Sequence, residues 1–156
     1  INIFVNHWPS RWGGQEKSNH KRVFASKVLS EYIDLNTSND EYTVVMGDFN
    51  DYPYNESVSK LTDDKKFINL MNSEYVSGKG SYNYKGKWGW LDQIIISENF
   101  RSPGVNLISS GSYKNDFMLY KNKNGEGVPS RSFGGNNWYG GFSDHLPVYF
   151  KFNFIK

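Results

Sequence analysis

The chain has 156 residues, which is enough for one packed domain. Of these, 37% are hydrophobic and 17% aromatic, a composition that argues against a disordered chain. It contains no cysteine, which excludes disulfides, thiolate metal sites and a Cys nucleophile, and no apolar run approaches the roughly 20 residues of a membrane span. The formal net charge of +2 comes from scattered Lys and Arg residues, so the composition permits a polyanionic partner but lacks the basic stripe of a dedicated nucleic-acid binder.

The first part of the chain alternates strand and helix patterns. Residues 1–6 have a strand period, and residues 42–46 form a short apolar run typical of a buried strand. Between them, residues 15–35 have a helical pattern, and a short helix is expected at 56–61. The longer helix carries an apolar stripe, which predicts its buried face: Phe24, Val28, Leu29, Tyr32, Ile33 and Leu35.

The second part is dominated by strands. Residues 81–88 predict a hairpin, and residues 91–97 predict another buried strand. A weak strand at 105–110 and a mostly loop segment at 114–135 precede a clear amphipathic strand at 146–154. The order of elements predicts an α/β (α+β) fold, in which helices cover one face of a sheet.

A polar loop directly follows the strand at 42–46. Asp48 and Asn50 are two residues apart, so their side chains extend to the same side of an extended segment. The carboxylate can accept a proton from water, and the amide can hold an oxyanion or orient that water. The alternative is an Asx-rich turn that serves only local hydrogen bonding.

Two of the three histidines lie beside predicted strand ends. His145 can act as an acid or as a cationic phosphate contact when a carboxylate holds it. Because chain neighbours point to opposite faces, the remote Asp92 suits this role better than Asp144. His7 follows the first strand, whereas His20 is expected to be exposed. A surface or capping histidine is the alternative for both His7 and His145.

Together these residue types are the ones that phosphodiester hydrolysis requires. They are a water-activating carboxylate, a neutral amide, two imidazoles and oxygen ligands for a hard cation. Zinc-finger and nucleotide-kinase functions are disfavoured, because the sequence has neither clustered Cys and His nor a glycine-rich phosphate loop.

Four motifs then carry a resemblance to a known family. In chain order they begin at Asn6, Gly47, Trp90 and Ser143, and read NHWPSR, GDFNDYP, WLDQI and SDHLP. Their residues and order resemble the endonuclease/exonuclease/phosphatase superfamily, whose fold is that of deoxyribonuclease I. The resemblance runs from Ile1 to about Phe150 and is greatest to a bacterial branch.

The resemblance implies a role for each matching residue. Asp48 would activate the attacking water, and Asn50 would stabilise the pentacoordinate transition state. His145 would contact the scissile phosphate or act as the general acid, and Asp92 would orient it. His7 would be a second phosphate contact, and Asp144 would be a ligand of magnesium (or manganese). Four further residues would contact the substrate: Asn6, Arg11, Tyr82 and Arg131.

The resemblance also implies a missing part. Superfamily members begin with a further half domain, which supplies a metal-binding Glu, and they form two packed sheets flanked by helices. Glu16 and Glu31 lie past the His7 motif, so neither matches that Glu. We therefore expect residues 1–156 to be one domain whose N-terminal half is absent. It would form half or more of a four-layer sandwich, with a mixed, mostly antiparallel sheet.

Two functions stay open at this point. The first is a magnesium-dependent phosphodiesterase, nuclease-like or acting on lipid phosphate or smaller phosphate esters. The second is an inactive fragment or binding module.

The last strand alternates Val148, Phe150, Phe152 and Phe154, and a sheet face left uncovered would favour self-association. A bacterial protein of the periplasm or the exterior is favoured over a cytoplasmic one.

Overall fold

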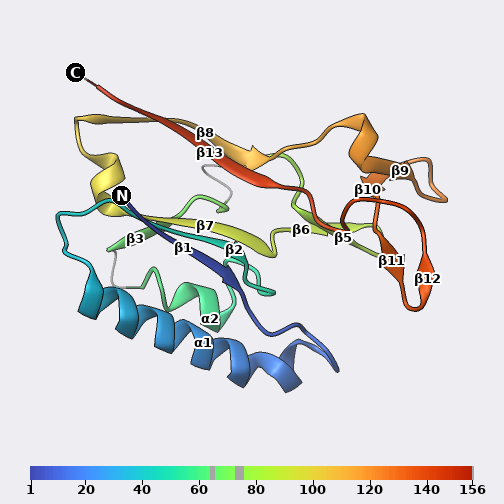
Figure 1. The fold of residues 1–156 in the computed structure, drawn as a ribbon, viewed down its shortest axis with the longest axis horizontal. Helices are drawn as coiled ribbons and strands as arrows, with labels where there is room; N and C mark the ends of the chain where they lie inside the picture. Colours follow the sequence, from blue (N-terminus) through green and yellow to red (C-terminus); the bar gives the residue numbers. More distant parts are fainter. Residues whose placement is uncertain (64–65, 73–75, 156) are drawn as a thin grey trace.

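Two β-sheets lie face to face, and two helices cover the outer face of the first sheet (Figure 1). The computed structural model describes residues 1–63, 66–72 and 76–155. The first sheet has the strand order β1-β2-β7-β3, and the second has the order β13-β8-β4. Only β1–β2 and β4–β8 pair in parallel among these neighbours. The mixed, mostly antiparallel α/β architecture agrees with the expected fold class.

The strands of the two sheets are β1 (Asn2–His7), β2 (Thr43–Asp48), β3 (Phe67–Asn69), β4 (Val76–Ser77), β7 (Asp92–Ser97), β8 (Val105–Ser112) and β13 (Val148–Phe154). Three hairpins extend beyond them: β5 (Tyr82–Tyr84) with β6 (Lys87–Gly89), β9 (Leu119–Lys121) with β10 (Gly127–Pro129), and β11 (Phe133–Gly134) with β12 (Asn137–Trp138). The helical segments are α1 (Gln15–Asn36), α2 (Glu56–Ser59), η1 (Glu98–Arg101) and η2 (Asp116–Met118).

The central strands of the first sheet are buried on both faces, as their apolar runs predict. Val44 packs between the two sheets, whereas its neighbour Val45 packs under the helices. Ile94 and Ile96 likewise contact the second sheet, and Ile95 contacts the helix side. Because successive strand residues point to opposite faces, one short apolar run supplies two cores.

The long helix forms where its pattern predicts, but the predicted buried face is mostly wrong. Phe24, Val28, Tyr32 and Leu35 are exposed, and of the expected stripe only Ile33 is fully buried. The residues that face the sheet include polar ones at helical spacing: Ser18, Arg22 and Ser26. They are tolerated there because the Arg22 guanidinium is paired with Asp51, as described below.

The prediction that residues 114–135 are mostly loop is also partly wrong. Residues 114–135 contain η2, β9, β10 and β11, and β12 follows them. The strands β3 and β4 and the turn η1 were not predicted either. These elements have two to four residues each, which is too short for an alternating pattern to emerge.

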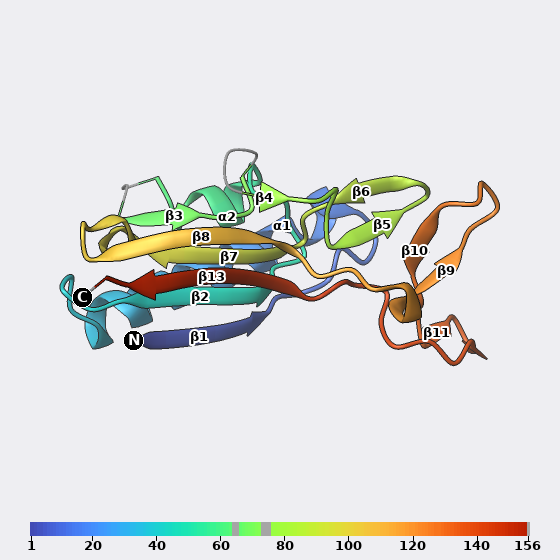
Figure 2. The same ribbon diagram turned by 90° about the horizontal axis from the view of Figure 1, so that it is seen from above.

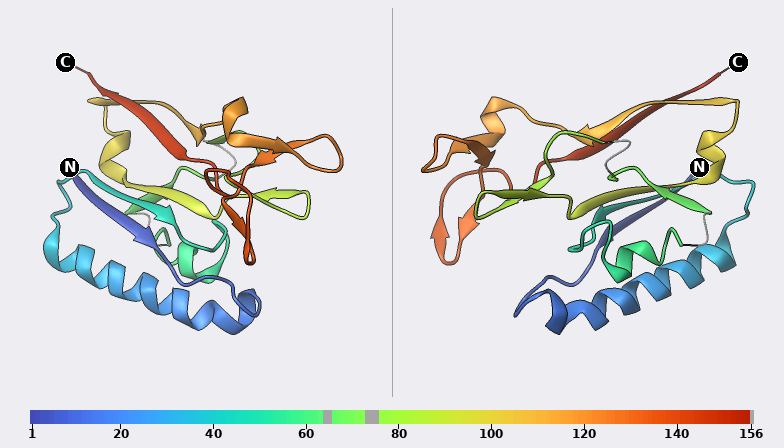
Figure 3. Two further views of the ribbon diagram at one scale, coloured as in Figure 1. Left: turned by 45° about the vertical axis from the view of Figure 1, so that its right-hand side comes forward. Right: turned by 180° about the vertical axis from the view of Figure 1, so that it is seen from behind.

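The last strand closes the second core. Val148, Phe150 and Phe152 are partly buried against the first sheet, so most of the apolar face of β13 is covered, whereas Phe154 at its end is 52% exposed. The expected exposed face lies elsewhere, on β1 and α1, which Figure 3 shows along one flank of the molecule. No helix in the described part of the chain is both long and apolar enough to cross a membrane.

Candidate active site

The strand register brings three of the predicted residues into one row. His7, at the end of β1, is the register partner of Asp48 at the end of the parallel strand β2. Asp48 is in turn the partner of Asp92, which begins the antiparallel strand β7. Side chains at neighbouring register positions lie about 5 Å apart. His7 and Asp92, which are 85 positions apart in the chain, are therefore brought together where these strands end or begin.

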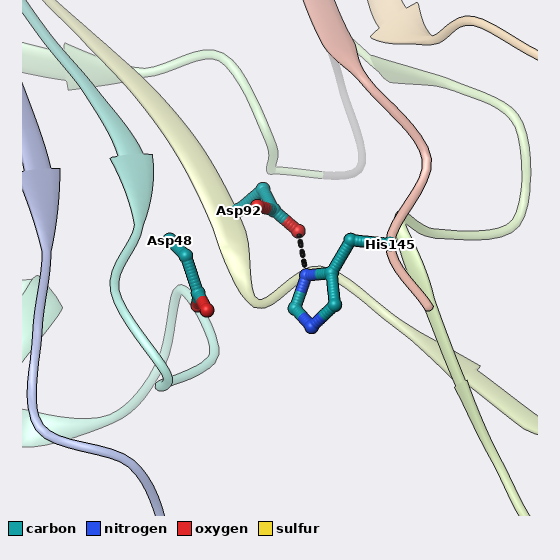
Figure 4. Close-up of side chains that lie close together, drawn as sticks. All are labelled: Asp48, Asp92 and His145. Atoms are coloured by element: carbon teal, nitrogen blue, oxygen red, sulfur yellow. Dashed lines mark hydrogen bonds and ion pairs between the residues drawn. The ribbon is translucent and has the colours of Figure 1, made fainter. Parts of the chain in front are cut away.

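His145 reaches this row from the loop before β13. Its Nδ1 lies 2.6 Å from Asp92 Oδ2, and the imidazole points toward Asp48 (Figure 4). The predicted contact between His145 and the remote Asp92 is confirmed. Tyr82 packs beside the imidazole, with ring centroids 4.7 Å apart, and forms a β-bridge with His145. The ring is therefore held on two sides, with Nε2 directed away from Asp92.

The loop after β2 fixes Asp48 and Asn50 together. The Asn50 backbone N–H donates to Asp48 Oδ1 at 2.8 Å, and the Asn50 side-chain amide donates to Asp48 Oδ2 at 3.1 Å. Asn50 adopts a φ of 50°, a left-handed conformation that Asn tolerates better than most residues. The Asx turn considered as the alternative is present, and it orients the carboxylate. His7 Nε2 lies 3.6 Å from Asp48 Oδ2 on the exposed side.

The two central groups have shifted proton affinities. Burial raises the pKa of Asp48 above its usual range, and the Asp92 charge adds to this, while the hydrogen bond from the Asn50 backbone opposes it. Burial by itself would lower the pKa of His145. The hydrogen bond and charge of Asp92, with the charge of Asp48, outweigh burial, so the pKa of His145 is raised. The site thus favours a more basic carboxylate beside a protonated imidazole.

A buried ionic network supports this loop, and the sequence analysis did not single out its centre. Asp51 is fully buried and pairs with Arg22 Nε at 2.7 Å and with Arg11 Nη2 at 3.0 Å. Arg11 also donates from Nε to the Asn50 carbonyl at 2.6 Å. Arg11, expected as a substrate contact, is thus placed against the loop that carries Asp48 and Asn50. No signal in the sequence pointed to Arg22, because the apolar stripe predicted another face of the helix as the buried one.

The other predicted residues lie around the row. Asn6 accepts a hydrogen bond from Trp8 Nε1 at 3.2 Å. Asp144 is exposed, and its carboxylate lies 4.0 Å from Arg131 Nη2. Burial raises the pKa of Tyr82, which keeps its hydroxyl neutral, and Arg131 hydrogen-bonds to it. Arg131, Tyr82 and Asp144 therefore form a second polar group beside His145.

Asp48, Asp92 and His145 can each offer a ligand atom within 4.8 Å of the others, an arrangement suited to a metal ion. A hard cation such as Mg²⁺ prefers carboxylate oxygens and is commonly held by one or two of them, with water and substrate phosphate completing its shell. The two carboxylates fit that chemistry, and a cation would relieve their mutual repulsion. His145 is the weaker donor, because its Nδ1 is already engaged by Asp92.

The mixed α/β fold thus places this row of polar groups where neighbouring strands of the first sheet end or begin. The sequence profile of the Endonuclease/Exonuclease/phosphatase family matches residues 1–153. The chain belongs to this family, in agreement with the resemblance found in its motifs. No curated protein sequence matches the chain.

Solved structures share the fold at low identity. A functionally unknown conserved protein from Enterococcus faecalis is 17% identical with a TM-score of 0.61, and the match covers 98% of this chain and 50% of that protein. A Bacteroides thetaiotaomicron mannosyl-6-phosphatase is 17% identical with a TM-score of 0.63, covering 97% and 51%. A Staphylococcus aureus beta toxin variant with bound magnesium ions is 16% identical with a TM-score of 0.61, covering 94% and 51%. This chain spans about half the length of these structures.

Proposed function

We propose that the chain carries catalytic residues of a metal-dependent hydrolase that cleaves phosphoester bonds, with a phosphodiester as the favoured substrate. The observation that carries the proposal is the arrangement of Asp48, Asp92 and His145, in which the imidazole is held by one carboxylate and faces the other. Family membership and the phosphatase among the solved structures support the same reaction class.

In this proposal Asp48 accepts a proton from the attacking water, which its raised pKa favours. Asn50 orients Asp48, and its amide would stabilise charge on the reacting phosphate by exchanging one of its two present acceptors, Asp48 Oδ2 or the Trp8 carbonyl, for a phosphate oxygen. His145 Nε2 contacts the scissile phosphate and protonates the leaving oxygen, while Asp92 fixes the ring through Nδ1. His7 is proposed as a second phosphate contact, and Asn6, Arg11, Tyr82 and Arg131 as groups that position substrate.

Magnesium, or manganese in its place, is the proposed cofactor. The Asp92 carboxylate would hold it, with Asp144 as a further ligand, so that Asp48 keeps its role as the proton acceptor. When bound, the ion supplies charge stabilisation for the phosphate oxygens. The magnesium ions in the beta toxin variant support this choice of metal.

The decisive experiment compares hydrolysis of a chromogenic phosphodiester, a chromogenic phosphomonoester and plasmid DNA, with magnesium and with chelator. We expect turnover to require magnesium and to fall by roughly 10²- to 10⁴-fold in His145→Ala, because proton transfer contributes about that factor. His20→Ala is the matched control, since His20 is exposed on α1. Turnover that survives chelation or His145→Ala would contradict the proposal.

We also propose that the chain associates with itself in solution through the apolar face of β1 and α1. Ile3 and Val5 are 62% and 80% exposed, and Phe24 is 66% exposed on the adjoining helix. Val5 and Phe24 line one groove, and exposed apolar surface of this kind favours association.

A further inference from the structure

The backbone ladder between β2 and β7 ends at the row of reacting groups. Asp48 and Asp92 are the last register partners of the two strands at this end. One more backbone bond follows, in which the Phe49 N–H donates to the Leu91 carbonyl at 2.9 Å. The chain then turns away at Asn50, which has a φ of 50°. Among the described residues, no further backbone hydrogen bond joins the loop after β2 to the segment before β7.

The Gln93 side chain bridges this gap. Gln93 is fully buried, and it points to the helix side of β7 because its neighbour Asp92 points to the opposite face. Gln93 Nε2 donates to the Asp51 carbonyl at 2.9 Å and to the Trp90 carbonyl at 2.6 Å. The two hydrogens of one amide are therefore used on the two sides of the gap.

A second buried amide fixes the orientation of the first. Asn69, which is 2% exposed on β3, donates from Nδ2 to Gln93 Oε1 at 3.0 Å. Asn69 Oδ1 in turn accepts from the Met71 N–H at 2.8 Å. Since Oε1 is held by Asn69, the Nε2 end of Gln93 is the end that faces the two carbonyls. A buried network with its groups satisfied in this way is rigid.

The segment before β7 supports both ends of the reacting row. On one side the Tyr52 ring, in the loop after β2, packs on Gly89, where a Cβ would lie 2.4 Å from the ring. On the other side the Ser81 N–H donates to the Gly89 carbonyl at 3.0 Å. The Ser81 carbonyl accepts from the Leu146 N–H at 2.7 Å, and Leu146 directly follows His145. A shift of this segment would therefore move His145 relative to the loop after β2.

We infer that Gln93 is a positioning residue, whose amide sets the spacing between Asp48, the proton acceptor, and His145, the general acid. The inference rests on the proposed function for the roles of these two groups. Both act on one phosphate in the same reaction, so their separation has to match the attacking and leaving oxygens. Misplacement of a reacting group by about 1 Å can cost about 10²-fold in rate. Gln93 itself touches neither substrate nor reacting atoms, so its loss should leave substrate affinity almost unchanged.

The test measures kcat and KM for the chromogenic phosphodiester with magnesium. Gln93→Met keeps the length of the side chain but cannot donate to the two carbonyls. We expect kcat to fall by roughly 10- to 10²-fold, with KM changed by less than about twofold. Asn69→Ala, which loosens the Gln93 amide without removing its donors, should lower kcat by only about threefold. This second variant tests the inference even where Gln93→Met fails to fold.

Ser97→Ala is the matched control. It removes another buried, hydrogen-bonded side chain at the far end of the same strand, where Ser97 Oγ accepts from the Thr43 N–H at 3.0 Å. We expect Ser97→Ala to leave kcat unchanged at a temperature where both variants are folded, as urea denaturation verifies. An equal fall of kcat in Ser97→Ala would overturn the inference, because general loosening of β7 would then explain both results.

NMR gives a readout that does not depend on turnover. The Gly89 α-protons lie against the Tyr52 ring, so the ring current displaces their resonances. Gln93→Met should move these resonances toward those of a glycine without aromatic contact, and Ser97→Ala should not. Unchanged Gly89 resonances, an unchanged kcat, or a rise in KM alone would each overturn the inference. Displaced resonances in a protein whose unsubstituted form has no phosphoester turnover would contradict the proposed function alone.

Discussion

The contact between His145 and Asp92 governs the protonation of the site near neutral pH. The carboxylate stabilises the imidazolium more than burial destabilises it, so the folded protein holds this proton more tightly than the unfolded chain does. The pair therefore contributes its full stability below the ordinary imidazole pKa of 6.5, and that contribution is lost as the pH rises through the higher folded value.

We expect Asp92→Asn to lower the pKa of His145, because it removes the hydrogen bond to a charged carboxylate and the charge itself. The measurement is an NMR titration of the imidazole protons in both proteins. A His145 midpoint at or below 6.5 in the unsubstituted protein would contradict this account of the pair.

Asp51 and Arg22 tie the loop after β2 to α1 through a fully buried ion pair. We expect Arg22→Met to destabilise the protein by about 3–5 kcal/mol, because it leaves the Asp51 carboxylate buried with one fewer partner. Lys27→Met on the same helix is the control. Its pair with Glu31 is exposed, and its loss should cost at most about 0.5 kcal/mol. Urea denaturation measures both. Equal costs would show that the buried pair does not support the loop.

At the scale of elements, Gly47 allows β1 and β2 to align their ends. Gly47 has a φ of 127°, and a Cβ there would lie 2.1 Å from the Asn6 carbonyl oxygen on β1. A side chain would therefore separate the strands just where His7 and Asp48 are register partners. The Gly-Asp sequence thus serves the strand pairing as well as the loop.

Gly47→Ala should consequently lower the free energy of unfolding by at least about 2 kcal/mol, through backbone strain and the clash with Asn6. Gly104→Ala is the control, since open space surrounds its Cβ position and its φ is not left-handed. That variant should be neutral or slightly stabilising. Thermal unfolding compares the two, and a Gly47→Ala protein as stable as Gly104→Ala would rule out the proposed clash.

The elements also differ in how well the sequence predicts them. The buried strands β2 and β7 were found because each is a short uninterrupted apolar run, and the last strand because its apolar residues alternate. The buried face of α1 was mispredicted, because its apolar stripe is exposed and a paired arginine faces the sheet. Periodicity identifies an element, but it does not show which neighbour the element packs against.

For the whole molecule, the two sheets leave edge strands on the same side. β1 is the edge of the first sheet and β13 the edge of the second; in Figure 2 β1 lies along the margin of the molecule, and β13 lies inward of it, beside β2 in that view. β1 also adjoins a groove of about 730 Å³ that is lined largely by apolar residues of α1. Exposed edges next to apolar surface are sites of association.

We expect the protein to sediment as a dimer or larger species at high concentration, and Val28→Lys to shift it toward the monomer. Val28 lines the groove and is 48% exposed, so a charge there disfavours its burial in a contact. Ile108→Lys is matched, because Ile108 is equally exposed at 48% but lies on β8. Sedimentation velocity over a range of concentrations measures the effect. A monomer at all concentrations would contradict the expectation.

The sequence by itself determined the mixed α/β class, the main strands, the family and the pairing of His145 with a remote acid. These follow from local alternation and from motifs whose residues are adjacent in the chain. The tertiary structure alone decided the row of His7, Asp48 and Asp92, the support from Arg22 and Asp51, and the bridge from Gln93 to the loop after β2. Each of these depends on strand register or on packing between distant segments, and neither leaves a periodic trace in the sequence.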